Sequence, residues 1–326
     1  MPTAVTAIIP NWNRQDLLAV VLRSLAAQSV PPSEVLVVDC ASEDASVEVA
    51  HRAGARVVRL DRNRGFAAAV NQGVALCRTE WVAVLNNDVE LQPRWIEKLI
   101  EAASRPGVWF AVGKLVKTDR PDVLDGAFDE VARSGCAWRC GEAKPDGPLW
   151  NRGMKIRFAP MTAALVRREL FNKIGGLDER FESYLEDVDF GLRCALSGFE
   201  GVYEPAAVSS HRGSATLGAW HPDKVRLMSR NQVLLAAKYY PRNWLIRYGW
   251  PAFTGQLLWG LVALRHGRAR AWLAGKREGL RRSADVRCAA DHPRLGEVLR
   301  ESEREIRKLQ KAAGADWYWR LYFALT

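Results

Sequence analysis

Hydrophobic and polar positions follow two alternating patterns over the first 115 residues of the chain. Short runs rich in β-branched residues are separated by segments in which apolar residues recur every three or four positions. In the segment Asp16–Gln28, for example, Leu17, Val20, Val21 and Leu25 fall on one helical face. This alternation predicts an α/β fold in which a mostly parallel central sheet is flanked by helices.

The same patterns predict elements along the rest of the chain. The expected strands are Val5–Ile9, Val35–Asp39, Arg56–Leu60, Trp81–Leu85, Val108–Val112, Ile156–Val166 and one near Gly201–Tyr203. The other expected helices are Phe66–Cys77, Trp95–Ala103, Arg168–Ile174, Ser183–Ser197, His221–Tyr240 and Pro293–Ala312. Residues 118–152 contain much Gly, Asp and Pro, which favours loops and short pieces over one side of the sheet. Residues 1–220 are therefore expected to form one domain, and residues 221–326 a helical extension.

Charge is distributed unevenly along the chain. The net charge is +10, but residues 221–326 carry 21 Lys and Arg against 9 Asp and Glu, whereas residues 1–220 carry 26 against 28. The basic surplus therefore belongs to the C-terminal third. It indicates an anionic partner for that part: a membrane surface, a phosphorylated acceptor or a nucleic acid.

The basic third also contains an apolar, tryptophan-rich stretch. Between Trp244 and Arg282 there are four Trp and eight Lys or Arg against one acid. The uncharged run Tyr248–Leu264 has 17 residues, the lower limit for a membrane-spanning helix, and it contains Pro251. The composition favours an amphipathic element in the membrane interface, with a pair of core helices as the alternative.

The cysteines bear on the compartment and on metal binding. Six are scattered along the chain, and no basic segment followed by an apolar one opens the sequence, so a reducing, cytoplasmic location is expected. Cys136 and Cys140 are close in sequence, but no second pair of Cys or His lies nearby. Buried thiols are expected there in preference to a zinc site.

Polar side chains follow the first two expected strands. The first strand leads into Pro10, Asn11, Trp12, Asn13 and Arg14, where a dinucleotide-binding fold would need G-x-G-x-x-G. The sequence therefore disfavours a dehydrogenase of that kind. Ligands of α/β sheets bind at this edge, although Asn13 is also suited to capping the next helix. Asp39 ends the second strand and is suited to accept hydrogen bonds from a base or a ribose, while Ser42 is suited to either ligand binding or helix capping.

The third and fourth expected strands are also followed by candidate ligand-binding residues. Arg64 and Gly65 precede a helix lined with small residues that also contains Asn71, a combination that favours phosphate binding but is compatible with helix packing. Asn86, Asn87 and Asp88 follow the fourth strand. A carboxylate at a buried strand tip is suited to hold Mn²⁺ or Mg²⁺ against a diphosphate, and a simple turn is the alternative.

Taken together, these motifs resemble those of a known enzyme family. The segments PNWNR, VVDCASED, NRGFAAAVNQG, LNNDVEL and GGLDERFESYLEDVDFGLRCALSGFE are similar in order and spacing to the inverting family 2 glycosyltransferases, and most of all to rhamnosyltransferase-type members. The resemblance covers roughly residues 3–240. It implies a GT-A nucleotide-diphospho-sugar transferase fold, with nucleotide-sugar binding in residues 1–115 and acceptor binding and catalysis in residues 116–220.

The resemblance also implies roles for individual residues. Asp88 stands at the D-x-D-type metal motif, in which Asn86 replaces the first Asp, and His211 helps to bind the metal or the diphosphate. The nucleotide-sugar site would consist of Pro10, Asn11, Asn13, Arg14, Asp39, Ser42, Arg64, Gly65, Asn71, Asn86 and Asn87.

The resemblance places the catalytic base at Asp187, since the acceptor hydroxyl must lose a proton as it attacks. Glu186, Asp189 and Arg193 would support the site or bind the acceptor. Structural explanations also exist for these neighbours: Ser183-x-x-Glu186 matches a helix capping box, and Asp189 with Arg193 is an i,i+4 pair.

The implied activity is transfer of a sugar, with L-rhamnose the first candidate, from a UDP- or dTDP-sugar to a glycan or lipid-linked acceptor in cell-surface polysaccharide synthesis. The enzyme would be cytoplasmic and peripheral at the inner face of the cell membrane. A processive synthase would need several spanning helices and a Q-x-x-R-W motif, which the sequence lacks. The sequence is also compatible with a catalytically inactive nucleotide-sugar-binding protein and with a basic nucleic-acid-binding protein. Carboxylates at the strand tips argue against a nucleic-acid partner.

Overall fold

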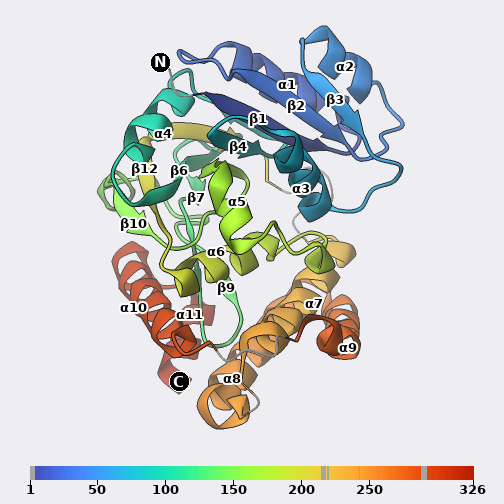
Figure 1. The fold of residues 1–326 in the computed structure, drawn as a ribbon. Helices are drawn as coiled ribbons and strands as arrows, with labels where there is room; N and C mark the ends of the chain where they lie inside the picture. The colour runs from blue at the N-terminus through green and yellow to red at the C-terminus, as the bar shows by residue number, and fades with distance from the viewer. Residues whose placement is uncertain (1–3, 214–217, 219, 242, 288–291) are drawn as a thin grey trace.

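The computed structural model describes residues 4–213, 218, 220–241, 243–287 and 292–326. Its central feature is a ten-stranded sheet whose main path runs in the order β10-β12-β6-β11-β4-β1-β2-β3 (Figure 1). The strands are β1 (Val5–Asn11), β2 (Glu34–Asp39), β3 (Arg56–Arg59), β4 (Trp81–Leu85), β5 (Val89–Leu91), β6 (Val108–Lys117), β7 (Leu124–Gly126), β10 (Met154–Ile156), β11 (Ala163–Arg167) and β12 (Glu200–His211). A separate hairpin consists of β8 (Asp129–Val131) and β9 (Ala137–Arg139).

The strands that carry the candidate residues are parallel neighbours. β1 pairs in parallel with β2 on one side and β4 on the other, and β2 pairs in parallel with β3. β11 runs antiparallel between β4 and β6, and β6 then pairs in parallel with β12. The carboxyl ends of β1, β2 and β4 therefore meet at one edge of the sheet, where α/β folds bind ligands.

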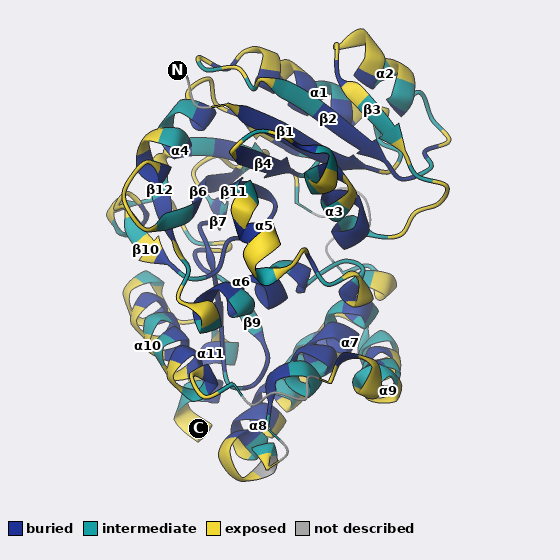
Figure 2. Ribbon diagram, viewed as in Figure 1, coloured by how far each residue is buried: buried dark blue, intermediate teal, exposed yellow. Residues whose placement is uncertain are grey.

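Helices cover both faces of the sheet. The helices of the first 200 residues are α1 (Gln15–Ala26), α2 (Ser46–Arg52), α3 (Phe66–Leu76), α4 (Trp95–Ala103), α5 (Arg168–Ile174) and α6 (Glu186–Ser197). Because side chains alternate along a strand, Ala7 and Ile9 of β1 share a buried cluster with α1, α2 and α4, whereas Ile8 packs with α3, α5 and α6. Figure 2 shows the central strands β1 and β4 as buried between these layers, whereas the edge strand β3 is partly exposed.

The C-terminal third forms five helices that pack onto the rest of the protein. They are α7 (Pro222–Tyr239), α8 (Trp244–Arg265), α9 (Ala269–Val286), α10 (Leu295–Ala313) and α11 (Trp317–Leu325). Leu258, Ile306 and Trp319 belong to the same buried cluster as Ile8 of β1. Residues 221–326 thus share the core of residues 1–220.

The structure corrects two expectations about the elements and confirms a third. The expected strand Ile156–Val166 is two strands, β10 at the sheet edge and β11 in its centre, because the chain turns between them at residues 157–162. Residues 118–152 contain β7, β8 and β9, each of three residues, which confirms the expected loops and short pieces; strands this short have no alternating pattern to recognise. The last strand, β12, continues to His211 and is much longer than Gly201–Tyr203.

Two further expectations concern the thiols and the apolar stretch. Cys40, Cys77, Cys136, Cys140 and Cys194 are buried free thiols, while Cys288 lies outside the described residues. Within the described parts of the chain, no helix combines the length and the apolar character that crossing a bilayer requires.

Candidate functional site

The ends of β1, β2 and β4 bring the candidate polar residues into contact. Asn11 and Asp39 are register partners at the ends of β1 and β2. The side-chain amide of Asn87, just after β4, donates to Oδ1 of Asn11 at 2.8 Å. Pro10 precedes Asn11 in β1, beyond the last pairing of β1 with β4 at Ile8. The two strands are therefore no longer paired at their polar ends. The missing N–H of Pro10 thus removes no hydrogen bond between β1 and β4.

Asp39 presents an unused acceptor at this edge. Its side chain is buried, and Oδ2 accepts a hydrogen bond from the backbone N–H of Ser42 at 3.0 Å. Within the described residues, Oδ1 is buried without a hydrogen-bond partner. A buried carboxylate oxygen without a partner is costly, so Oδ1 has the chemistry to bind a donor from outside the protein, such as a base N–H or a ribose hydroxyl.

Ser42 and Asn13 fix the loops around Asp39. The hydroxyl of Ser42 accepts from the backbone N–H of Asn13 at 2.7 Å, and Oδ1 of Asn13 accepts from the backbone N–H of Glu43 at 2.9 Å. Asn13 therefore ties the two loops together and does not cap α1, whose N-cap is Arg14. Arg14 pairs with Asp16 through two 3.1 Å hydrogen bonds and also interacts electrostatically with Asp88.

Asp88 and His211 form the candidate metal centre. The antiparallel pairing of β5 with β12 places Val89 opposite His211, so the two functional side chains meet. Nε2 of His211 lies 3.1 Å from Oδ1 of Asp88, and Nδ1 lies 2.7 Å from Oδ2 of Asp125. Burial would lower the pKa of His211, but the two carboxylates outweigh it and raise the pKa to about 9.

This arrangement fits a divalent cation. A metal-binding histidine generally donates its second ring N–H to a carboxylate, as Nδ1 does here to Asp125, which leaves Nε2 facing Asp88 as a ligand pair. Across the described ranges, no group of three or more His, Cys, Asp or Glu side chains is arranged to hold a metal. Asp88 and His211 would therefore supply two ligands, and diphosphate oxygens and water the remainder.

Asp187 lies at the start of α6 in a partly buried charged cluster. Its Oδ1 accepts from the backbone N–H of Val188 at 2.8 Å. Burial raises the pKa of Asp187, while the positive charge of Arg139 acts in the opposite direction. Arg139, from β9, lies 3.6 Å from Asp129 and 3.5 Å from Asp125, the partner of His211. The candidate metal ligands are therefore linked to Arg139 through Asp125, and Arg139 acts on the candidate base electrostatically.

Glu186 is buried beside Asp187. Its pKa is raised well above the usual range by burial and by the charge of Asp187. Among the residues that the structure describes, Oε2 of Glu186 is buried and has no hydrogen-bond partner. The expected capping box does not form, since the N-cap of α6 is Leu185 and the hydroxyl of Ser183 accepts from the backbone N–H of Phe66.

That contact also changes the interpretation of the motif around Arg64. The first N–H groups of α3 are occupied by the Glu182–Ser183 loop, because Ala67 N–H donates to the carbonyl of Glu182 at 3.0 Å. Gly65 is needed because φ is +88° and a Cβ would lie 2.8 Å from the Glu182 carbonyl oxygen. The start of α3 is therefore in contact with protein, and the expected phosphate contact at Arg64 and Gly65 stays a prediction.

The two polar side chains of the same motif also have protein partners. Arg64 pairs with Glu179 at 2.8 Å. Asn71 exchanges hydrogen bonds with the backbone N–H and carbonyl of Leu177, each at 2.8 Å. Both residues thus hold the segment that leads to Asp187, and their expected contacts with the nucleotide-sugar stay predictions.

Asp189 and Arg193 have structural contacts as well. Asp189 is completely buried and contacts Arg193 at 3.0 Å, Lys238 at 2.6 Å and the hydroxyl of Tyr239 at 2.8 Å. Arg193 also donates to the carbonyls that end α5. Of the two roles expected for this pair, the geometry favours support of the site over contact with an acceptor.

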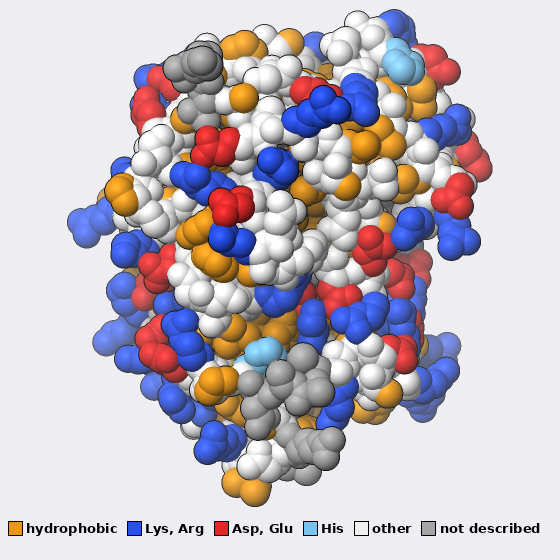
Figure 3. Space-filling view, in the orientation of Figure 1, with side chains coloured by type: hydrophobic (Ala, Val, Ile, Leu, Met, Phe, Trp, Pro, Cys, Tyr) orange, Lys and Arg blue, Asp and Glu red, His pale blue; other side chains and the backbone are white. Residues whose placement is uncertain are grey.

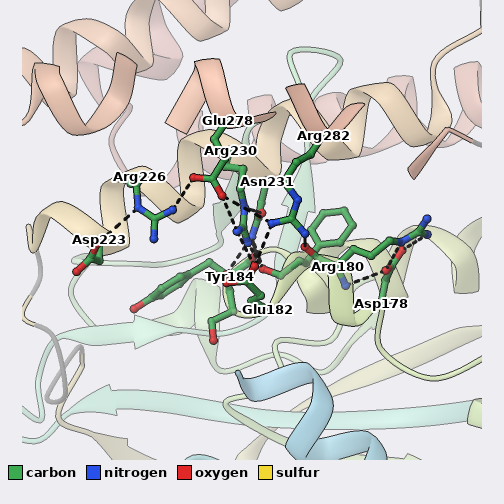
Figure 4. Close-up of polar contacts among 12 residues, drawn as sticks. Asp178, Arg180, Glu182, Tyr184, Asp223, Arg226, Arg230, Asn231, Glu278 and Arg282 are labelled. Carbon is green, nitrogen blue, oxygen red and sulfur yellow. Dashed lines mark hydrogen bonds and ion pairs between the residues drawn. The ribbon is translucent and has the colours of Figure 1, made fainter. Parts of the chain in front are cut away.

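Sequence reasoning missed the clamp formed by Arg230 and Asn231 of α7 (Figure 4). The amide of Asn231 donates to the carbonyls of Phe181 at 2.9 Å, Ser183 at 2.9 Å and Tyr184 at 2.6 Å. Arg230, with a side chain 1% exposed, pairs with Glu182 at 2.8 Å. Three consecutive polar residues on one turn of an expected helix, Arg230 to Gln232, were the available signal.

The clamp stabilises a strained stretch of backbone just before α6. Glu182, Tyr184 and Leu185 all have positive φ, at 62°, 69° and 65°. Residues other than glycine adopt this region at a cost, which the surrounding contacts must offset. Because Leu185 directly precedes Glu186 and Asp187, the clamp fixes the approach to the candidate base.

Comparison with known proteins identifies the family of this chain. Residues 6–175 match the profile described as Glycosyl transferase family 2. The chain belongs to this family. N-acetylglucosaminyl-diphospho-decaprenol L-rhamnosyltransferase of Mycobacterium tuberculosis H37Rv is 30% identical over 242 residues, which cover 67% of this glycosyltransferase and 78% of that protein. The O-antigen biosynthesis protein RfbC of Myxococcus xanthus is 31% identical over 224 residues, 65% of this chain and 17% of that protein.

Solved structures agree on the fold. GalNAc-T7, solved with UDP, GalNAc and Mn²⁺, has a TM-score of 0.62 at 12% identity, covering 93% of this glycosyltransferase and 58% of that chain. The mannosyltransferase PcManGT of Pyrobaculum calidifontis, in complex with GDP-Man and Mn²⁺, has a TM-score of 0.53 at 17% identity, covering 98% and 86%. The GT-A-like fold expected from the sequence is thereby confirmed.

Proposed function

We propose that this glycosyltransferase moves a sugar, with L-rhamnose the first candidate, from a UDP- or dTDP-sugar to a hydroxyl of a glycan or lipid-linked acceptor, with inversion at the anomeric carbon. The observation that carries the proposal is the group of charged side chains in which His211 contacts Asp88 and Asp125, Arg139 contacts Asp125, and Arg139 interacts electrostatically with Asp187. The name of the mycobacterial relative supports the sugar and a lipid-linked acceptor.

Different residues would act on the donor and on the acceptor. Oδ1 of Asp39 would accept a hydrogen bond from the base or ribose of the nucleotide. A divalent cation held by Asp88 and His211, Mn²⁺ or Mg²⁺, would neutralise the charge of the departing diphosphate. Arg14, which interacts electrostatically with Asp88, lies on the same side and adds positive charge.

On the acceptor side, Asp187 would take the proton of the attacking hydroxyl. Its burial makes the carboxylate a stronger base, and the guanidinium of Arg139 limits the rise of its pKa so that the ionised form persists. Direct displacement needs only this one base and no covalent sugar–enzyme intermediate, because the hydroxyl attacks the anomeric carbon itself. Asp129, whose pKa burial raises to about 7, shares Arg139 with Asp187.

The test is a panel of UDP-, dTDP- and GDP-sugars assayed with Mn²⁺ for donor hydrolysis and for transfer to polyprenyl-diphosphate-linked sugars. Turnover of one UDP- or dTDP-sugar is expected. The variant Asp187→Asn should bind that donor as tightly as the parent protein while losing transfer. Donor binding without turnover in the parent protein would favour an inactive nucleotide-sugar-binding protein.

We also propose that the enzyme works in the cytoplasm, at the inner face of the cell membrane. A lipid-linked acceptor would be anchored in that membrane. The basic surplus of residues 221–326 supports attraction to anionic headgroups. We propose no nucleic-acid partner for the enzyme.

A further inference from the structure

The outward face of α8 is apolar along its length. Its exposed large side chains are Ile246, Trp250, Phe253, Leu257, Leu261 and Leu264. They succeed one another at steps of three or four residues and therefore form one stripe. Between Tyr248 and Leu264 the helix has no charged residue. Since a surface helix normally turns charged and polar side chains to water, the exposed face of α8 has the composition of a buried one.

The opposite face of α8 is already packed, so the stripe cannot turn inward. A Cβ on Gly255 would lie 2.3 Å from Cβ of Ser134. The side-chain amide of Gln256 donates to the carbonyl of Ser134 at 2.8 Å, and Nε1 of Trp259 donates to Oγ of Ser229 at 3.1 Å. One face of α8 is therefore core, as the alternative interpretation of this stretch has it, and the other face has the composition expected of an element in the membrane interface.

α11 extends the apolar surface. Nε1 of Trp250 donates to the carbonyl of Leu325 at 2.7 Å, which joins the two helices. Trp317, Leu321 and Leu325 are exposed at steps of four residues on α11. Nine of the twelve exposed large hydrophobic side chains in the described residues belong to α8 and α11. In Figure 3, hydrophobic side chains reach the lower tip of the molecule, where Figure 1 draws α8.

Basic side chains surround this surface. Arg247 and Arg265 are exposed near the two ends of the α8 stripe, and Arg320 is exposed on α11 beside Leu321. Apolar side chains with Trp at the boundary and Arg around it match the layers of an anionic bilayer surface, from acyl chains to headgroups. The charge favours an anionic lipid surface over a second copy of the chain, because two such basic rims would repel each other.

We propose that the exposed faces of α8 and α11 are the docking surface for an anionic phospholipid bilayer, in which they lie parallel to the membrane plane. The inference deepens the proposed function, since it names the surface that would bring the enzyme to a membrane-anchored acceptor. The docking surface is also linked to the candidate active site. Ser134, held by α8, lies in the turn between β8 and β9, and β9 carries Arg139. The docked helices would thus support the hairpin whose Arg139 interacts electrostatically with Asp187.

The experiment is flotation of the full chain with vesicles of phosphatidylcholine alone or of an equimolar mixture with phosphatidylglycerol. The parent protein should float with the mixed vesicles and bind them at least about tenfold more tightly than neutral ones. The double variant Phe253→Ser/Leu257→Ser should lose about tenfold or more of this partitioning. The double variant Arg247→Gln/Arg265→Gln should lose the preference for phosphatidylglycerol.

Leu280→Ser is the matched control, because Leu280 is 66% exposed on α9 and outside the two helices. It should partition as the parent protein does. Hydrolysis of the soluble donor should be unchanged in all variants. This control verifies that the variants fold, and it separates membrane docking from catalysis. A parent protein that docks but shows no turnover would refute the proposed function and leave the docking surface standing. Equal flotation of the parent and the Phe253→Ser/Leu257→Ser variant would overturn the docking surface. So would a dimer in sedimentation velocity that only the apolar substitutions dissociate, or salt-sensitive binding to duplex DNA in place of vesicles.

Discussion

Nδ1 of His211 lies 2.7 Å from Oδ2 of Asp125. His211 ends the long strand β12, whereas Asp125 lies in β7, a strand of three residues within the stretch expected to form loops and short pieces. The contact fixes the orientation of the imidazole ring, so that Nε2 faces Asp88. Asp125 is therefore part of the candidate metal centre although it does not face the metal position itself.

Removal of that contact should weaken metal activation. In Asp125→Ala, the ring loses the acceptor that orients it, and we expect about 10- to 100-fold weaker activation by Mn²⁺ in the donor-hydrolysis assay. Asp125→Asn retains an acceptor and should lose less. Asp146→Ala, which removes the partner of Lys114, is the matched control and should leave Mn²⁺ activation unchanged. If Asp125→Ala followed the Mn²⁺ titration of the parent protein, His211 would not be a ligand oriented by Asp125.

The guanidinium of Arg139 should set the acidic limit of the pH profile. Burial raises the pKa of Asp187 and Arg139 lowers it, so removal of the positive charge must raise that pKa further. A base is active when ionised, and the acidic limb of kcat/KM is therefore expected at higher pH in Arg139→Gln than in the parent protein. Arg139→Lys keeps the charge and should shift the limb less. A limb at the same pH in all three proteins would exclude Asp187 as the titrating base.

The strand ends could be predicted from the sequence because their signals are local. Buried β-branched runs that stop at Asn11, Asp39 and Asn86 define both the strands and the edge at which they meet. Parallel pairing then brings Asn11 beside Asp39 without any knowledge of the loops. The family resemblance added Asp187 and His211, which lie far from these strands in sequence.

The remaining parts of the site depend on tertiary contacts. Arg139, Asp125 and Asp129 come from strands of three residues, which have no periodicity to detect. The contact between Ser183 and the start of α3 could not be predicted, because nothing local indicates a partner more than 100 residues later. The capping pattern at Ser183 failed for the same reason, since that hydroxyl already binds α3.

Asp39 should contribute to nucleotide affinity through its unused oxygen. In Asp39→Asn, one side-chain oxygen can still accept from Ser42, but an NH₂ group then occupies the position of Oδ1 and repels a donor from the nucleotide. We expect about 10- to 100-fold weaker binding of UDP or dTDP by calorimetry. Asp44→Asn, which changes a side chain that accepts from the backbone N–H of Ser46 at the start of α2, is the matched control and should bind normally. Unchanged affinity in Asp39→Asn would place the base elsewhere.

Asn231 should act as a positioning residue for Asp187. Asn231→Ala removes three hydrogen bonds from the strained loop before α6, which costs about 3 kcal/mol of stability and releases the approach to the base. We expect kcat to fall about tenfold or more with little change in the KM for the donor, because the nucleotide site is separate. Gln232→Ala, the next residue of α7, loses its contact with Lys276 and is the matched control. If both variants lowered Tm alike and left kcat unchanged, the clamp would serve stability alone.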